Sequence, residues 1–434
     1  MTETASFRAR LRRFASRLTG RDDFERLAVL ERALRRSAEA QQLHSAGLQS
    51  VQSKLADLAD RSAKQASNET EALREVRDAV RKLGDRIAKH EDPLFAEGRR
   101  YLRRELEKTA AGSGPIIIGP WTGEVGFELL YWIPFVRWAC AEFGIDSQRV
   151  IVISRGGVAS WYGVPQDQYA DVFGIIEPEQ FRAATTAERP SQKQRERDAL
   201  DDRILEAVTR QRGCSNAKVL HPGMMFRAFK QFFDDEVGYE RLDEFTRPAL
   251  LEPPVASRPG LPSDYIAVRF YFRRSFPDTP AIRAFAEAVV RNLARTVPVV
   301  VLTSGVRVDD HHDWTPRNAA EAFRQTGAGD SRGVTVFGDA PADRNLEVQS
   351  AIVGGARAFV GTFGGLSHLA PLYGIPSVGF YSRHAFEAHH QYVAERTFER
   401  IGAGHLTTVD VSQADLVGSA LQPLAGAAFR NGGA

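Results

Sequence analysis

Short apolar runs rich in β-branched residues alternate with helical segments along most of this chain. This alternation limits the fold more than any other feature. The run at residues 115–119 (PIIIG) precedes a helix expected over residues 127–143, and a second run, RVIVIS, follows at residues 149–154. A strand, a helix and a strand within about 40 residues form a right-handed βαβ unit. With a further strand expected at residues 218–220, the sequence predicts a parallel α/β lobe.

The same alternation starts again after a proline-rich stretch at residues 248–262. Strands are expected at residues 265–272, 297–303, 334–338, 358–362 and 377–381, with helices at 280–295, 346–354 and 366–374. Strands that alternate with helices form doubly wound parallel sheets. We therefore predict two Rossmann-like lobes, at residues 113–250 and 263–425. A ligand cleft is expected between them, beside the carboxyl ends of the strands.

The first 95 residues have a different period. Apolar residues recur at alternating spacings of three and four, the seam of a coiled coil, at Leu48, Val51, Leu55 and Leu58 and again at Leu73, Val76, Val80, Leu83 and Ile87. This pattern predicts a helical coiled coil over residues 23–95, with a change of phase across residues 60–70. We expect it to form a homo-oligomer. A hairpin within one chain, or packing against the body, is the alternative.

Residues 7–21 (FRARLRRFASRLTGR) form a basic segment. Phe7, Leu11, Phe14 and Leu18 recur at helical spacing and arginines fill the other faces, which predicts an amphipathic helix within residues 1–22. Such helices bind anionic membrane surfaces. The alternative is a solvated lead-in to the coiled coil.

The composition excludes several classes of protein. Lys and Arg number 57 against 55 Asp and Glu, so the net charge of +2 gives no reason to expect a nucleic-acid partner. Two cysteines exclude a disulfide framework and a cysteine-rich zinc site. No run approaches the ~18 apolar residues of a membrane span, and no secretory signal is recognisable. We expect a cytoplasmic protein, peripheral on the inner face of the cytoplasmic membrane if the basic helix binds lipid.

A glycine-containing loop, residues 119–128 (GPWTGEVGFE), connects the first expected strand to its helix. Gly123 and Gly126 let the backbone approach a ligand, and the helix N-terminus favours an anion. Glu124 and Glu128 place carboxylates at the cleft. Either is a candidate general base, and the alternative is that they stabilise the helix dipole.

Two segments of the second half carry candidate anion-binding groups. Arg269 lies late in a strand and Arg273 follows it, where guanidinium groups can bind a diphosphate or pair with a carboxylate such as that of Asp278. In the segment 362–376 (TFGGLSHLAPLYGIP), a strand ends at Thr362 and glycines form the turn. Backbone N–H groups and the side chains of Ser367 and His368 in the first helical turn can hold phosphate oxygens.

The segment TFGGLSHLAPLYGIPSVGFYS resembles the nucleotide-sugar-binding segment of GT-B glycosyltransferases, notably the heptosyltransferase type with its (S/G)GxxHLAxxxGxP pattern. The loop GEVGFEL has the spacing of the GGLGNQL loop of GT-B fucosyltransferases. It is also similar to the heptosyltransferase loop whose acidic residue, six before a proline, is the base; Glu128 stands six before Pro134. Arg269 looks like the diphosphate-binding arginine of the fucosyltransferase HxRR strand, although Ala267 replaces its histidine and Phe127-Glu128 replaces the Asn-Gln pair.

The resemblance implies a GT-B-type glycosyltransferase that transfers a sugar from a nucleotide-diphosphate sugar to a glycan or lipid-linked acceptor in surface polysaccharide synthesis, with no cofactor or metal. The second lobe would bind the donor through Arg269, Arg273, Thr362, Gly364, Gly365, Ser367 and His368, and the first would bind the acceptor through Trp121, Gly123, Gly126 and His221. Glu128 or Glu124 would be the base if the reaction inverts the anomeric centre, and none is needed if it retains. A nucleotide-sugar 2-epimerase of similar fold and a non-catalytic coiled-coil scaffold are the alternatives.

The segment 309–313 (DDHHD) has the composition of a metal site. Adjacent loop residues cannot all face one ion, and metal sites usually draw their ligands from separated positions. We therefore expect a polar loop here.

Overall fold

The computed structural model describes residues 93–188, 194–233, 239–255, 261–303, 312–316, 333–338, 340–382, 384–402 and 404–413. The chain divides into two compact units, Met1–Glu91 and Asp92–Ala434. The expected basic helix and the expected coiled coil, apart from its last three residues, lie outside the described residues. All further description concerns the second unit.

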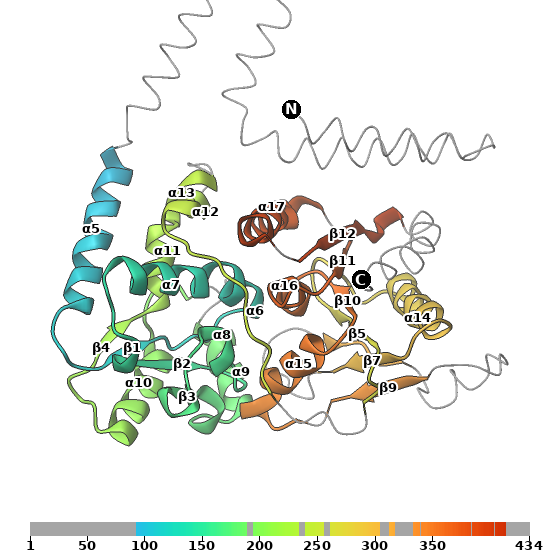
Figure 1. Ribbon diagram of the computed structural model, residues 1–434, viewed down its shortest axis with the longest axis horizontal. Helices are drawn as coiled ribbons and strands as arrows, with labels where there is room; N and C mark the ends of the chain where they lie inside the picture. The colour runs from blue at the N-terminus through green and yellow to red at the C-terminus, as the bar shows by residue number, and fades with distance from the viewer. Residues whose placement is uncertain are drawn as a thin grey trace, which may run out of the picture. The chain divides into compact units, whose positions relative to one another are not determined.

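The first sheet contains parallel strands in the order β3-β2-β1-β4 (Figure 1). They are β1 (Ile116–Ile118), β2 (Val150–Ser154), β3 (Tyr169–Asp171) and β4 (Lys218–Leu220). The central strand β1 pairs on both sides, with Ile117 opposite Ile151 of β2 and Val219 of β4. Its three isoleucines are buried because helices cover both faces of a parallel sheet.

The helix after β1 begins at Val125, earlier than expected, and contains a π-helical turn. It runs through α6 (Val125–Phe127), the π-helical turn η1 (Glu128–Trp132) and α7 (Ile133–Glu142). Helix α10 (Ala199–Arg212) begins at Ala199, where Asp198 and Asp201 form a capping box. The other helices of this lobe are α5 (Pro93–Ala110), α8 (Ala159–Tyr162), α9 (Pro178–Glu188), α11 (Pro222–Ala228), α12 (Lys230–Phe233) and α13 (Tyr239–Glu244).

The second sheet is also parallel, in the order β12-β11-β10-β5-β7-β9. Its strands are β5 (Ile266–Arg269), β7 (Val299–Leu302), β9 (Val334–Phe337), β10 (Ala358–Thr362), β11 (Ser377–Tyr381) and β12 (Leu406–Asp410). Its helices are α14 (Pro280–Ala294), α15 (Asn345–Gly354), α16 (Gly365–Leu372) and α17 (His384–Ile401). The prediction of two parallel α/β lobes is confirmed.

The strand expected at residues 265–272 is divided in the structure. Its first part is β5, and its second part, β6 (Tyr271–Phe272), leaves the parallel sheet to pair antiparallel with β8 (His312–Asp313). Gly361 of β10 lies so close to Arg269 that a Cβ atom there would stand 2.0 Å from the Arg269 carbonyl oxygen. Because the chain leaves the parallel sheet after β5, Arg269 and the residues after it lie at the end of the sheet.

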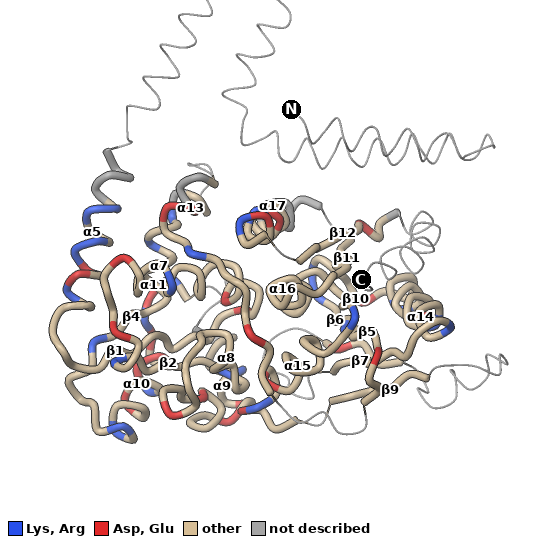
Figure 2. Tube along the Cα trace, viewed as in Figure 1, with Lys and Arg blue, Asp and Glu red and all other residues tan. Residues whose placement is uncertain are grey.

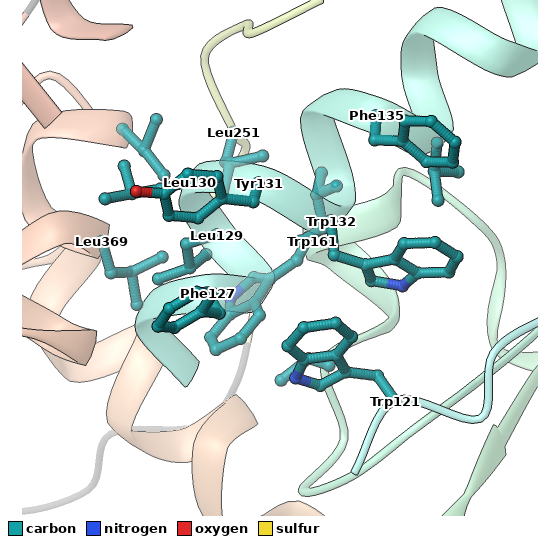
Figure 3. Close-up of a cluster of buried hydrophobic side chains, with 14 of the residues drawn as sticks. Trp121, Phe127, Leu129, Leu130, Tyr131, Trp132, Phe135, Trp161, Leu251 and Leu369 are labelled. Carbon is teal, nitrogen blue, oxygen red and sulfur yellow. The ribbon is translucent and has the colours of Figure 1, made fainter. Parts of the chain in front are cut away.

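One hydrophobic core connects the two lobes. Trp121 and Trp132 are stacked with ring centroids 5.9 Å apart, and Leu129 and Leu130 extend the cluster toward Leu369 of α16 (Figure 3). Burial of apolar surface stabilises such contacts by roughly 25 cal/mol per Å². The lobes are thus held together by shared core packing.

Helix α5 belongs to this folded body. Its residues Leu102 and Leu106 are buried in the same core. Basic residues recur along α5 (Figure 2), and Arg99 pairs with Glu244 at 2.9 Å. In the described part of the chain, no helix has both the length and the apolarity that crossing a bilayer requires.

Candidate active site between the lobes

A cavity enclosing about 1170 Å³, its open mouth included, lies between the two lobes. Its first-lobe wall is formed by residues that follow β1, β2 and β3, and its second-lobe wall by residues that follow β5, β9 and β10. The cavity therefore lies at the carboxyl ends of both sets of parallel strands, where α/β proteins bind their ligands. We call this cavity the cleft.

The N-terminus of α16 forms part of the cleft wall. Gly364 has a φ of +136°, and a Cβ atom there would lie 2.3 Å from the Tyr271 hydroxyl oxygen, so the turn requires glycine. Gly364 and Gly365 both line the cleft. The first N–H groups of a helix have no acceptor within it, and they favour an anion at this end.

The hydroxyl groups of Thr362 and Ser367 are engaged in the fold. Ser367 Oγ accepts a hydrogen bond from Gly364 N at 2.9 Å and donates one to Gly364 O at 2.8 Å. Thr362 Oγ1 accepts from Tyr271 N and donates to Tyr271 O, both at 3.0 Å. These two predicted donor-binding residues therefore shape the turn and hold β6, and neither is among the residues lining the cleft.

His368 does line the cleft, although it is only 3% exposed. Neither of its ring nitrogens has a hydrogen-bond partner among the described residues. Burial, and secondarily the charge of Arg273, lower the pKa of the imidazole to about 3. The ring is therefore neutral near pH 7, with one N–H to donate and one nitrogen to accept.

Both predicted arginines of the second lobe line the cleft. Arg269 donates to Asp313 Oδ1 from Nη2 at 3.1 Å and to Gln349 Oε1 from Nη1 at 2.9 Å. Its carboxylate partner is thus Asp313, whereas Asp278 pairs with Arg283 at the surface. Arg273 Nη1 lies 3.9 Å from Glu124 Oε2 of the first lobe.

The two candidate bases occupy different environments. Glu124 immediately precedes α6, lines the cleft, and has a 28% exposed side chain. Glu128 lies one turn further into the core, is fully buried and is not among the cleft residues. Its Oε1 accepts hydrogen bonds from Ser154 Oγ at 2.5 Å and Tyr162 OH at 2.7 Å. Burial raises the pKa of Glu128 to about 7, while these hydrogen bonds and Arg155 act in the opposite direction.

Of the predicted acceptor-binding residues, only Gly126 lines the cleft. Trp121 is fully buried against Trp132. His221 caps α11, accepting from Gly223 N at 3.0 Å through Nδ1, and its Nε2 lies 3.0 Å from Asp201 Oδ2.

The two glycines of the loop meet different neighbours. A Cβ atom at Gly126 would lie 3.4 Å from His368 Nδ1, so the first turns of α6 and α16 approach closely there. Gly123 packs against the Trp121 ring, and its carbonyl oxygen accepts a hydrogen bond from Arg155 Nη2.

Several cleft residues lie outside the predicted site. Arg155 and Gly156 directly follow β2, and Asp313 lies in β8 opposite Tyr271. For Arg155 and Gly156 the available signal is the Arg-Gly-Gly sequence at a predicted strand end. His390 comes from α17, where its Nδ1 is 2.9 Å from the Tyr131 hydroxyl oxygen. From the sequence, His390 lies beyond the strand expected at residues 377–381, and contact with the donor or with solvent alone were the two interpretations; the structure places it at the cleft.

Among the described residues, no group of three or more His, Cys, Asp and Glu side chains is placed to hold a metal ion. Residues 309–311 of the DDHHD segment lie outside the described part. Asp313, its last residue, is paired with Arg269.

Comparisons with known proteins found structural similarity alone. No family model matches the chain, and no curated protein matches it. Among solved structures, E. coli heptosyltransferase WaaC with ADP is 16% identical over 71% of this chain and 99% of its own, with a TM-score of 0.38. A family 9 glycosyl transferase from Veillonella parvula DSM 2008 is 8% identical over 72% of this chain and 90% of its own, with a TM-score of 0.35. UDP-GlcNAc 2-epimerase from Methanocaldococcus jannaschii is 10% identical over 73% of this chain and 93% of its own, at 0.30.

The structure has two parallel α/β lobes whose strand ends face one cleft, which is the arrangement that the resemblance to GT-B glycosyltransferases implied.

Proposed function

We propose that this protein is a GT-B-type glycosyltransferase that transfers a sugar from a nucleotide-diphosphate sugar to a hydroxyl group of a glycan or lipid-linked acceptor. The observation that carries the proposal is the meeting of Arg273 and Glu124 across the cleft, at 3.9 Å. One supplies a cation at the end of a parallel sheet, and the other supplies a carboxylate from the opposite lobe. A transfer that inverts the configuration needs a base for the acceptor hydroxyl and a cation for the leaving group, close together on opposite sides of the anomeric carbon.

The second lobe binds the donor diphosphate in this proposal. Arg269 and Arg273 supply guanidinium groups, and the first turn of α16 supplies backbone N–H groups beside Gly364 and Gly365. Neutral His368 has an N–H available for a phosphate oxygen. Arg269 is held by Asp313 and Gln349, and the glycine turn fixes the α16 N-terminus, so these donors need little rearrangement as charge develops on the leaving group.

Glu124 is the proposed base, since it lines the cleft and Glu128 does not. Its carboxylate takes the proton of the acceptor hydroxyl as that oxygen attacks the anomeric carbon. The bond from this carbon to the diphosphate breaks, the anomeric configuration inverts, and the nucleoside diphosphate leaves with its electron pair. Arg273 and the α16 N-terminus stabilise the negative charge that the diphosphate acquires.

A thermal-shift panel of UDP, GDP, ADP, CMP and dTDP sugars tests the proposal. A ligand that binds only the folded state at 100 times its Kd stabilises it by about 2.7 kcal/mol, so the matching donor should raise Tm. Arg273→Gln should abolish the shift. Arg283→Gln, which removes a surface partner of Asp278 on the same lobe, is the matched control and should keep it.

The panel also separates the alternatives. If no nucleotide sugar raises Tm, the scaffold interpretation is favoured. If the protein converts a nucleotide sugar to its 2-epimer with no acceptor present, it is an epimerase, because a transferase yields no epimer.

A further inference from the structure

Arg155 differs from the other arginines of the cleft in its partners. Arg269 is paired with Asp313, and Arg273 lies near Glu124. Arg155 has no ion pair within 4.0 Å of a carboxylate oxygen in the part of the chain that the structure describes. Yet it is only 5% exposed and lines the first-lobe side of the cleft. A guanidinium removed from water normally has a charged or polar partner for its donors.

The contacts of Arg155 fix its position and leave donors unused. Nη2 donates to the carbonyl oxygen of Gly123, and the guanidinium carbon lies 5.8 Å from the centre of the Phe181 ring. The buried Nε has no acceptor among the described residues, and Nη1 makes no hydrogen bond to them either. The side chain is thus held as a preorganised cation whose Nη1 donors are unpaired among the described residues, while Nε is enclosed by the protein.

The carboxyl groups of Glu128 and Asp171 do not fully balance the positive charge of Arg155. Glu128 interacts with Arg155, but both of its hydrogen bonds, from Ser154 and Tyr162, fall on Oε1, and its Oε2 has no partner among the described residues. Burial raises the pKa of Glu128 to about 7, so near neutral pH a large share of this carboxyl is protonated. Asp171 contributes to the same effect, because its negative charge raises the pKa of Glu128.

The position of Arg155 in the fold separates it from the donor groups. It follows β2 of the first sheet, whereas Arg269, Arg273 and the α16 N-terminus belong to the second lobe. The next residue, Gly156, accepts a hydrogen bond from Glu347 N of α15 at 2.7 Å. The turn that carries Arg155 is therefore anchored where the lobes meet, with its donors on the acceptor side of the cleft.

We propose that Arg155 is the centre of an anion subsite on the first lobe, which binds a carboxylate or phosphate group of the acceptor. This inference rests on the proposed function, and it adds that the acceptor is anionic. Arg155 selects such acceptors because its charge lacks a fully ionised counter-ion until the substrate supplies one. The subsite is separate from the diphosphate site, so the cleft binds two anions at once.

Calorimetric titration of the full-length protein with sulfate, in the presence of saturating inorganic pyrophosphate, tests the subsite. Pyrophosphate occupies the donor side, and sulfate, which does not titrate near pH 7, reports the second anion. Wild-type protein should bind sulfate under these conditions. Arg155→Gln should weaken sulfate binding at least tenfold and keep pyrophosphate binding. Arg273→Gln should weaken pyrophosphate binding and keep sulfate binding.

Several results would overturn the subsite. They are failure of the wild type to bind sulfate, equal affinity in wild type and Arg155→Gln, and equal weakening of both anions by either substitution, which would mean a single site. Repeating the titration with acetate in place of sulfate distinguishes a preference for carboxylate from one for phosphate. Because nucleotide sugars are absent, failure here is distinguishable from failure of the proposed function.

A second measurement applies if Arg155→Gln does not fold. An anion beside Arg155 should raise the pKa of Glu128 further, so sulfate binding to the wild type should take up protons at pH 7. Titrations in two buffers of different ionisation enthalpy measure this uptake, which should be smaller in Glu128→Gln. The groups that face Glu128 are Ser154, Tyr162, Arg155 and Asp171. Sulfate binding without proton uptake would place the anion elsewhere and overturn the proposal.

Discussion

Arg273 Nη1 and Glu124 Oε2 approach to 3.9 Å across the cleft, and they join the two lobes electrostatically. In the proposed reaction these groups have opposite tasks, since one holds the leaving diphosphate and the other removes a proton from the acceptor. A diphosphate that binds Arg273 competes with Glu124 for the same cation. Donor binding should therefore release the Glu124 carboxylate from Arg273 and leave it free to accept a hydrogen bond from the acceptor hydroxyl.

Replacement of Glu124 by Gln should lower turnover by about 10²–10⁴-fold, the usual contribution of a general base. The nucleotide-induced rise in Tm should remain, because the donor groups are unchanged. Steady-state rates with the donor found in the panel measure the effect. Glu142→Gln, at the exposed end of α7, is the matched control and should keep its rate.

Two other outcomes would change the assignment of the base. Loss of turnover in Glu128→Gln together with full turnover in Glu124→Gln would transfer the role to Glu128. Full turnover in both variants would remove the inverting mechanism altogether.

The buried carboxyl groups of Glu128 and Asp171 predict that stability falls as the pH rises. Burial raises the pKa of each to about 7, from ordinary values of 4.5 and 3.8. At a pH between the ordinary pKa and the raised pKa of each group, the folded state binds more protons than the unfolded state. Their stabilising contribution is therefore fully present below about pH 4 and is lost as the pH passes through 7.

Glu128→Gln isolates one of these two contributions. At 1.36 kcal/mol per pKa unit, Glu128 accounts for about 3 kcal/mol between pH 4.5 and pH 8. Urea unfolding at pH 5, 6, 7 and 8 measures the free energy of unfolding, which should decline less steeply in the variant. Parallel pH profiles of variant and wild type would show that Glu128 does not titrate as described.

Gly156→Ala should weaken the contact between the lobes. Gly156 has a φ of +75°, and an added Cβ atom would lie 2.9 Å from Leu346 Cγ and 3.1 Å from Leu346 N. Gly163, with a φ of +67° and no atom within 4 Å of such a Cβ, is the matched control. Both alanines incur about 1–2 kcal/mol for the left-handed conformation.

Only Gly156→Ala additionally pushes α15 away. It should therefore lower the urea midpoint more than Gly163→Ala does and should also weaken donor binding. Equal losses of stability in the two variants, with unchanged donor affinity, would mean that the turn does not hold the lobes together.

Removal of residues 1–91 should leave a folded body, because the second compact unit starts at Asp92 and α5 packs into its core through Leu102 and Leu106. All but the last four residues of the predicted coiled coil lie in the removed part, so the shortened protein should sediment as a monomer. Removal of α5 as well should cost several kcal/mol, since two buried leucines are lost. A shortened protein that sediments like the full-length oligomer would refute the coiled coil as the cause of association.

The strands were the most predictable part of the fold. The expected ranges of β4, β10 and β11 agree with the structure residue for residue, because β-branched or apolar runs there end at glycine, proline or polar residues. Strands β3 and β12 were missed. Tyr169–Asp171 is short and polar at its end, and Leu406–Asp410 carries two threonines and an aspartate, so neither has the apolar signal of a buried strand.

The site was only partly predictable, because sequence spacing fixes a position along an element and not the direction a side chain takes. Gly364, Gly365 and His368 follow a strand and begin a helix, which is enough to bring them to the cleft. Trp121 and Glu128 also follow a strand, three and ten residues after Ile118. Their side chains turn into the core, where Trp121 stacks on Trp132 and Glu128 accepts a hydrogen bond from Tyr162. No local sequence pattern predicts these tertiary contacts.

The π-helical turn Glu128–Trp132 contains one residue more than an α-helical path would use. Deletion of a single residue within it would restore an uninterrupted α-helix and rotate everything before it by about 100° relative to α7. Glu124 and Gly126 would then leave the cleft while Phe135 kept its place in the core. The presence of Glu124 and Gly126 in the cleft thus depends on a one-residue insertion in the helix. A related protein without that insertion would need its catalytic residues at other positions.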